Sequence, residues 1–108
     1  MTVEKLIDEL SLKEVSLVDA QREITGGYVG DLLSWVMGKA KSGDAWITIM
    51  SNVNIVAVAS LTDVSCIILA EGVEVDENVL DTAKQKGVNI LMSEKSAFEI
   101  ASGVAKLI

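Results

Sequence analysis

The chain has 108 residues, half of them hydrophobic, and a net charge of −7 at pH 7. This length suits a single domain over residues 1–108 with a packed core, and the hydrophobic content excludes a disordered chain. The nine Lys and Arg residues are scattered, whereas binding to nucleic acid or to an anionic membrane surface requires a basic patch. We therefore expect no nucleic-acid partner and no membrane.

Two residue counts exclude several chemistries, because the chain has no histidine and one cysteine, Cys66. Zinc sites made of His and Cys, triads with a His base and internal disulfides cannot form. Cys66 lies in the apolar run Cys66–Ala70, which predicts a buried structural thiol. A group of acidic residues lacks the spacing of a calcium loop, and we interpret it as solvated surface. These residues are Asp63, Glu71, Glu74, Asp76 and Glu77. We expect no catalytic residue, no metal ion and no cofactor.

The chain begins with an acidic, amphipathic segment whose apolar residues recur at helical spacing from Val3 to Leu10. We predict a helix over 3–11, capped by Thr2, and then a short strand within 14–19. The first residues do not read as a signal peptide, and the most apolar stretch, 55–70, is too short to span a membrane. The default location is the cytoplasm.

Two adjacent glycines follow, and we interpret Thr25-Gly26-Gly27 as a turn that opens a second helix over 28–41, with Gly43 as its stop. Lys39 and Lys41 suit the C-terminal end of that helix. A glycine turn at a helix N-terminus exposes N–H groups that favour an anion such as phosphate or carboxylate. The alternative is a tight connection that lets the helix pack closely on the sheet. The candidate ligand-binding residues are Arg22, Glu23, Thr25, Gly26, Gly27 and Tyr28.

From residue 45 onwards strands and helices alternate. Strands are predicted at 45–50, 66–70 and 88–92, and helices at 54–62, at 77–86 between Asp76 and Gly87, and from a Ser96–Glu99 capping box to about 107. The segment 54–62 has the propensity of a strand, but parallel strands on either side of it need a crossover, so we prefer a helix. Trp35 and Trp46 are either interface residues or ordinary core. The pattern predicts an α/β fold, three-layer α/β/α with a mainly parallel sheet of about four strands.

Five segments together resemble a known family, the DRTGG domain, over about residues 1–107. They are Thr25-Gly26-Gly27, 45–50, 54–61, 66–72 and 93–98. The resemblance implies a fold similar to the N-terminal, non-catalytic domain of HPr kinase/phosphorylase. It also implies a dimerisation or regulatory role, because the family is fused to CBS domains in regulated pyrophosphatases and occurs in some phosphate acetyltransferases. Glu23 and Ile24 stand where the family has Asp and Arg. Glu23 therefore keeps an acidic residue at the first position. Ile24 replaces the arginine at the second, although Arg22 lies nearby.

The preferred function is a non-catalytic regulatory or assembly module, homodimeric, that senses a small anionic ligand at the Thr25-Gly26-Gly27 turn. The ligand class is a nucleotide or phosphometabolite, and a protein partner is a further option. One alternative is an accessory protein of an anaerobic redox enzyme system, to which stand-alone members of the family are similar. The other is a small phosphotransferase-related enzyme, which needs a nucleophile or base that the sequence does not offer.

Overall fold

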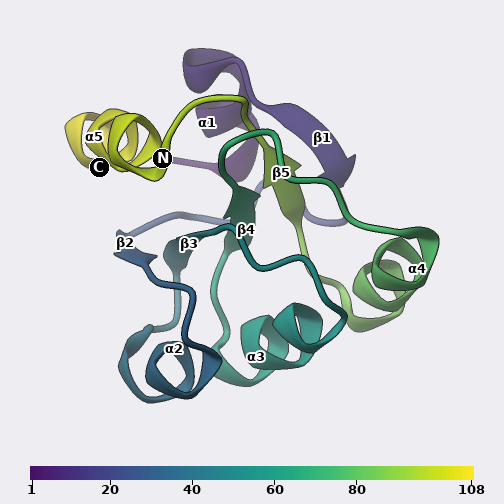
Figure 1. The fold of residues 1–108 in the computed structure, drawn as a ribbon. Coiled ribbons are helices and arrows are strands. Elements are labelled where there is room, and N and C mark those ends of the chain that lie inside the picture. Colours follow the sequence, from purple (N-terminus) through teal and green to yellow (C-terminus); the bar gives the residue numbers. More distant parts are fainter.

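The structure, a computed structural model, describes residues 1–108 and forms a sheet of five strands covered by five helices (Figure 1). The helices are α1 (Val3–Leu10), α2 (Leu33–Lys39), α3 (Asn54–Thr62), α4 (Glu77–Lys86) and α5 (Ala97–Leu107). The strands are β1 (Lys13–Ser16), β2 (Gly26–Val29), β3 (Asp44–Thr48), β4 (Cys66–Leu69) and β5 (Ile90–Met92). None of the helices has the length and apolar character that crossing a membrane requires.

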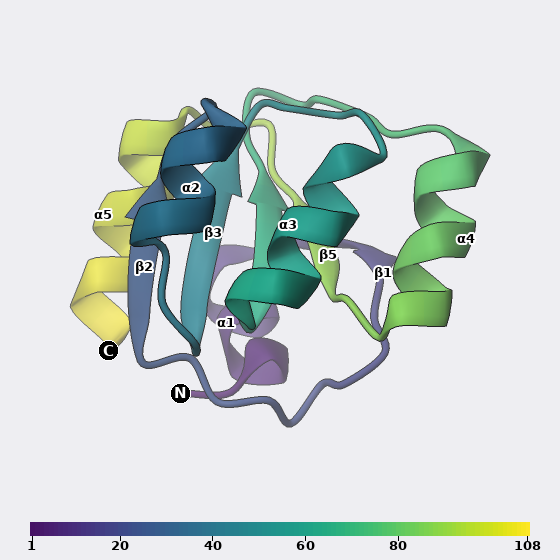
Figure 2. The ribbon, with the colours of Figure 1, turned by 90° about the horizontal axis from the view of Figure 1, so that it is seen from below.

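The strand order is β1-β5-β4-β3-β2, so β1 and β2 form the two edges of the sheet (Figure 2). Strands β2 to β5 run parallel to their neighbours, and β1 alone is antiparallel, to β5. Helices α2, α3 and α4 cover one face, and α1 and α5 cover the other (Figure 1). The predicted three-layer α/β/α fold with a mainly parallel sheet is confirmed, with one strand more than the sequence indicated.

The central strands have hydrophobic side chains on both faces because helices cover both. Trp46 and Ile67 belong to the core beneath α2, α3 and α4, whereas Ile47 and Cys66 belong to the core beneath α1 and α5. Cys66 is fully buried, as the sequence predicts, and burial raises the pKa of its thiol to about 12. A thiol with so high a pKa stays protonated at neutral pH and is a poor nucleophile.

Helix α3 settles the ambiguity of segment 54–62 in favour of a helix. Its side chains at Ile55, Val56, Val58 and Ala59 are buried, and it connects the parallel strands β3 and β4. The β-branched residues of this segment are therefore held in a helix by core packing and by the crossover, against their strand propensity.

Several predicted helix ends are also confirmed. Thr2 caps α1 by accepting from the Lys5 N–H, and Asp76 caps α4 by accepting from the Val79 N–H. The capping box between Ser96 and Glu99 opens α5. These ends are encoded within four residues of chain, which is why the sequence reveals them.

The predicted glycine turn is wrong, because Gly26–Val29 is the edge strand β2 and helix α2 begins only at Leu33. Neither Gly26 nor Gly27 has a positive φ. A Cβ on Gly26 would lie 2.6 Å from Asp44 Oδ1, so the glycine permits a close approach to the start of β3. Gly43, at φ 88°, shapes the turn into β3 and does not end α2.

Candidate functional site

A polar depression of about 420 Å³ lies beside the N-terminal end of β2. Four of the six predicted ligand-binding residues line it, joined by four residues of the segment from α2 to β3. The lining residues are Thr25, Gly26, Gly27 and Tyr28 from β2 and its start, and Lys39, Lys41, Ser42 and Asp44 from that segment. The tertiary structure thus surrounds the Thr-Gly-Gly-Tyr segment with basic and hydroxyl side chains.

The wall opposite β2 is a tight turn held by backbone and carboxylate contacts. The Lys41 N–H donates to Asp44 Oδ2 at 2.8 Å, and the Asp44 N–H donates to the Lys41 carbonyl at 3.0 Å. The Thr25 N–H donates to the Gly43 carbonyl at 2.9 Å, which joins the turn to β2. A Cβ at Gly43 would collide with Thr25 Oγ1, so this position requires glycine for space as well as for its φ.

The depression carries local positive charge on an acidic protein. Lys39 and Lys41 are exposed there, and Lys39 Nζ lies 5.0 Å from the centre of the Trp35 ring. Asp44 offsets part of this charge, but it is buried and its carboxylate already accepts the Lys41 N–H. Two ammonium groups with the hydroxyl group of Thr25 form a donor set that suits phosphate or carboxylate oxygens.

Arg22 and Glu23, the other two predicted residues, do not line the depression and are engaged in ion pairs. Arg22 Nη1 lies 3.1 Å from Asp63 Oδ1, and Arg22 Nη2 donates to the Asp63 carbonyl at 2.8 Å. Glu23 Oε2 lies 3.1 Å from the N-terminal ammonium of Met1. These contacts tie the residues that lead into β2 to the N-terminus and to the end of α3.

Ser42 connects the depression to the Arg22–Asp63 pair, because its hydroxyl donates to Asp63 Oδ2 at 2.5 Å. This hydrogen bond and, after it, the Arg22 guanidinium hold the pKa of the Asp63 carboxyl below its usual range. Sequence reasoning missed Ser42, Lys39 and Lys41 as site residues, because it assigned the two lysines to a helix end. The adjacent run Lys39-Ala40-Lys41-Ser42-Gly43 was the available signal.

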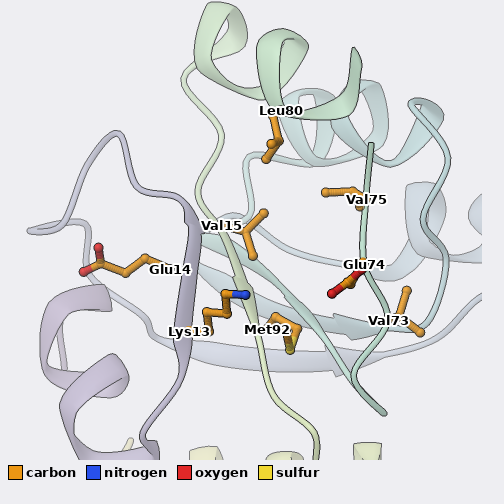
Figure 3. Close-up of a pocket in the computed structure, with 8 residues that line it drawn as sticks. All are labelled: Lys13, Glu14, Val15, Val73, Glu74, Val75, Leu80 and Met92. Atoms are coloured by element: carbon orange, nitrogen blue, oxygen red, sulfur yellow. The ribbon is translucent and has the colours of Figure 1, made fainter. Parts of the chain in front are cut away.

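Two further cavities lie at the two edges of the sheet. A groove of about 230 Å³ runs between β2 and α5, and seven of its eight lining residues are hydrophobic. A cavity of about 320 Å³ lies between β1 and the extended segment 73–75 (Figure 3). In Figure 3 the side chains of Val15, Val75 and Leu80 face one another at one end of it, while Lys13 and Glu74 bring opposite charges to the other end. None of the predicted ligand-binding residues lines the cavity between β1 and segment 73–75.

The fold and the polar depression define a small three-layer α/β domain with a basic site beside one edge of its sheet. The chain belongs to the DRTGG domain family, whose family model matches residues 29–107. The expected family is confirmed over a shorter range than the expected 1–107. The match begins at Val29, the last residue of β2, so the Thr25-Gly26-Gly27 segment precedes it.

A solved structure similar to the chain contains the CBS and DRTGG domains of the regulatory region of Clostridium perfringens pyrophosphatase, complexed with the activator diadenosine tetraphosphate. The TM-score is 0.73 at 14% sequence identity, and the match covers 95% of this chain. The chain spans 45% of the length of that structure's chain. At this identity the comparison shows the shared fold. No curated protein sequence matches the chain significantly.

Proposed function

We propose that the chain is a non-catalytic, cytoplasmic regulatory module that binds a small anionic ligand and works as a homodimer. The observation that carries the ligand proposal is the polar depression, where Lys39 and Lys41 stand beside the Thr25–Tyr28 segment. Its volume of about 420 Å³ falls within the range of small-molecule sites. The ligand class is a nucleotide or a phosphometabolite, because both carry phosphate oxygens that accept from ammonium and hydroxyl groups.

The family and the similar structure support a regulatory role. The pyrophosphatase region that shares this fold is regulatory, and a nucleotide is its activator. That region contains CBS domains as well as the DRTGG domain, so the activator is attributed to the region as a whole. For the present chain, the ligand proposal therefore rests on its own two lysines and on the Thr25 hydroxyl group.

The direct test measures the melting temperature of the chain with inorganic phosphate, with ATP and with diadenosine tetraphosphate. A ligand that binds only the folded state at one hundred times its Kd stabilises it by about 2.7 kcal/mol, which is a shift of several degrees for a domain of this size. We expect a shift with at least one of these probes, smaller at high salt because exposed charges are screened.

The double variant Lys39→Gln with Lys41→Gln identifies the site. We expect it to weaken binding by roughly tenfold or more, since two charge-assisted contacts are lost. The matched control is Lys84→Gln with Lys86→Gln on α4, which changes the net charge equally at exposed positions away from the depression. Equal loss of binding in both variants would mean a general charge effect, and no melting shift with any probe in the unmodified chain would overturn the ligand proposal.

A further inference from the structure

The cavity between β1 and segment 73–75 (the β1 cavity) lies at the opposite edge of the sheet from the polar depression and shares no residue with it. Met92, which lines the cavity, is the last residue of β5, so the cavity lies at the carboxyl end of that strand. Lys13 reaches the same end, because β1 runs antiparallel to β5 and Lys13 pairs with Met92. In open sheets of parallel strands, ligands bind outside the carboxyl ends of the strands.

The wall formed by segment 73–75 is fixed at its start. Glu71 and Gly72 both have a left-handed backbone, with φ of 60° and 70°, so the chain turns sharply after β4. The Glu71 N–H donates to the Lys95 carbonyl at 2.9 Å. The Gly72 N–H donates to the Ser93 carbonyl at 2.9 Å, so the turn is attached to the loop after β5. A wall that is already ordered lowers the entropy cost of binding a ligand.

The interior of the β1 cavity is aliphatic and incompletely covered. Four of its hydrophobic side chains are only half-buried, namely Val15, Val73, Val75 and Leu80. A ligand that covers the remaining surface of these side chains gains hydrophobic free energy. No aromatic ring lines the cavity, so its walls suit an aliphatic group and offer no stacking surface for a planar ring. The volume of about 320 Å³ lies at the small end of the range of ligand sites, which indicates a small molecule.

One positive and one negative side chain stand at the other end of the β1 cavity. Both ion pairs of the chain lie elsewhere, so neither Lys13 nor Glu74 has a charged partner. In Figure 3 the Lys13 ammonium and the Glu74 carboxylate point towards each other, whereas Glu14 extends to the far side of β1. A ligand with only a negative charge would be repelled by Glu74, and one with only a positive charge by Lys13. A molecule that carries both charges is attracted by both residues.

We propose that the β1 cavity binds a free aliphatic α-amino acid, for which L-leucine is the representative. The carboxylate of the amino acid accepts from the Lys13 ammonium, and its own ammonium donates to the Glu74 carboxylate. Its hydrocarbon side chain lies against Val15, Val75 and Leu80. The inference goes beyond the proposed function, because it assigns a second ligand site to other residues and does not depend on the anion site.

An NMR titration of the chain with L-leucine tests both the binding and its place. We expect the largest changes in amide chemical shift at Val15, Val75 and Met92, and none at Gly26 or Gly27. Changes confined to the polar depression would overturn the proposed site. No change with L-leucine would overturn the whole inference and leave the proposed anion site intact.

Three analogues of L-leucine test the ligand class in the same titration. Isocaproate lacks the ammonium group, isoamylamine lacks the carboxylate, and L-serine lacks the aliphatic side chain. We expect L-leucine to bind roughly tenfold or more tightly than each of them, because each analogue loses one of the three contacts. If isocaproate or isoamylamine bound as tightly as L-leucine, the recognition of two opposite charges would be wrong. Equal binding of L-serine would overturn the role of the aliphatic walls.

Substitutions of exposed residues test the two charged contacts. We expect Lys13→Gln and Glu74→Gln each to weaken the binding of L-leucine by roughly fivefold or more. The matched controls are Lys5→Gln and Glu9→Gln, which make the same changes at exposed positions on α1. Equal losses in the controls would mean a general charge effect and would overturn the assigned contacts.

The analogue without a carboxylate separates a direct contact of Lys13 from a structural role. Lys13→Gln should not weaken the binding of isoamylamine, because this ligand has no carboxylate for Lys13 to bind. An equal loss of affinity for isoamylamine and for L-leucine would mean that Lys13 only supports the cavity, and the proposed contact would be wrong.

The variant Val75→Phe tests the aliphatic part by filling the β1 cavity. Val75 is half-buried and faces Val15 and Leu80 (Figure 3), so a larger side chain at this position occupies the space of the ligand. We expect the variant to keep its circular dichroism spectrum and to lose the binding of L-leucine. Unchanged affinity would overturn the cavity as the site. If the variant does not fold, the exposed substitutions at Lys13 and Glu74 decide the question.

Discussion

The two edge strands are attached to the sheet by different chemistry. The β2 edge rests on an aromatic anchor, because Trp46 is fully buried and its indole N–H donates to the Gly30 carbonyl at 2.9 Å. The β1 edge rests on an amide anchor, because Asn89 is buried and joins the segment after β1 to β5. Asn89 Oδ1 accepts from the Val18 and Asp19 N–H groups, and Nδ2 donates to the Asp19 and Ser65 carbonyls.

The difference shows that the two edges of one small sheet are secured in different ways. An anchor inside the core leaves β2 itself without charged side chains. At the other edge, the Asn89 side chain holds the segment that follows β1. The charged residues of β1 and its irregular register with β5 discourage pairing with a further strand. Four substitutions test whether the edges differ in this way.

The largest expected effect is that of Trp46→Ala. Truncating a buried tryptophan costs about 3 to 5 kcal/mol of folding free energy, and here it also removes the contact to Gly30. Chemical denaturation measures the loss. Trp46→Phe is the matched variant, because it keeps most of the apolar volume; a loss as large as that of the alanine variant would mean that the hydrogen bond, and not packing, anchors β2.

The next effect is that of Asn89→Ala at the opposite edge. We expect a loss of about 2 to 4 kcal/mol, because several backbone groups lose their partner in a buried or partly buried place. Hydrogen exchange should show faster opening at Val18 and Asp19 than at Tyr28. If the exchange of β2 rose equally, the two edges would form one cooperative unit and the comparison would fail.

A smaller effect is expected from Arg22→Gln, which removes the pair with Asp63 beside the depression. Both groups are partly exposed, so we expect a loss of at most about 1 kcal/mol, reduced further by salt. The ligand-binding melting shift should persist, since Arg22 does not line the depression. Loss of that shift without loss of stability would instead assign Arg22 to the ligand.

The smallest effect is a pH dependence at Asp63. Because its folded pKa lies below the usual 3.8, the pair and the Ser42 hydrogen bond stabilise the fold fully above the unfolded pKa. That contribution is lost as the pH falls through the lowered folded pKa. The measurement is the free energy of unfolding as a function of pH. We expect Asp63→Asn to abolish the loss of stability that Asp63 causes at acid pH, whereas Glu74→Gln, at the β1 edge, should leave it unchanged.

The sequence was most informative after residue 44, where each strand is a short apolar run and two of the three helices, α4 and α5, carry their own caps. Asp76, Gly87 and the Ser96–Glu99 box are local signals, and the structure confirms all three. The helix at 54–62 required an argument about topology, because propensity alone favoured a strand. The similarity to HPr kinase/phosphorylase stays a prediction.

The candidate site was only partly visible before folding. Thr25, Gly26, Gly27 and Tyr28 were found because adjacent glycines are conspicuous, but the reason given for them was wrong. The segment contains few of the alternating apolar residues that reveal a strand, and its pairing with Asp44–Ile47 joins residues that are 18 positions apart. The lysines were recognised as part of a helix end and not as the wall of a depression.

The sequence by itself determined the three-layer class, the alternation of strands and helices after residue 44, and the burial of Cys66. These follow from apolar runs and from caps that act over a few residues. Only the tertiary structure decided that Gly26–Val29 is an edge strand, that Lys39 and Lys41 stand beside it and that Arg22 is bound to Asp63. The physical reason is that an edge strand of glycines is stabilised by its neighbour β3 and by packing on Trp46, and not by its own residues.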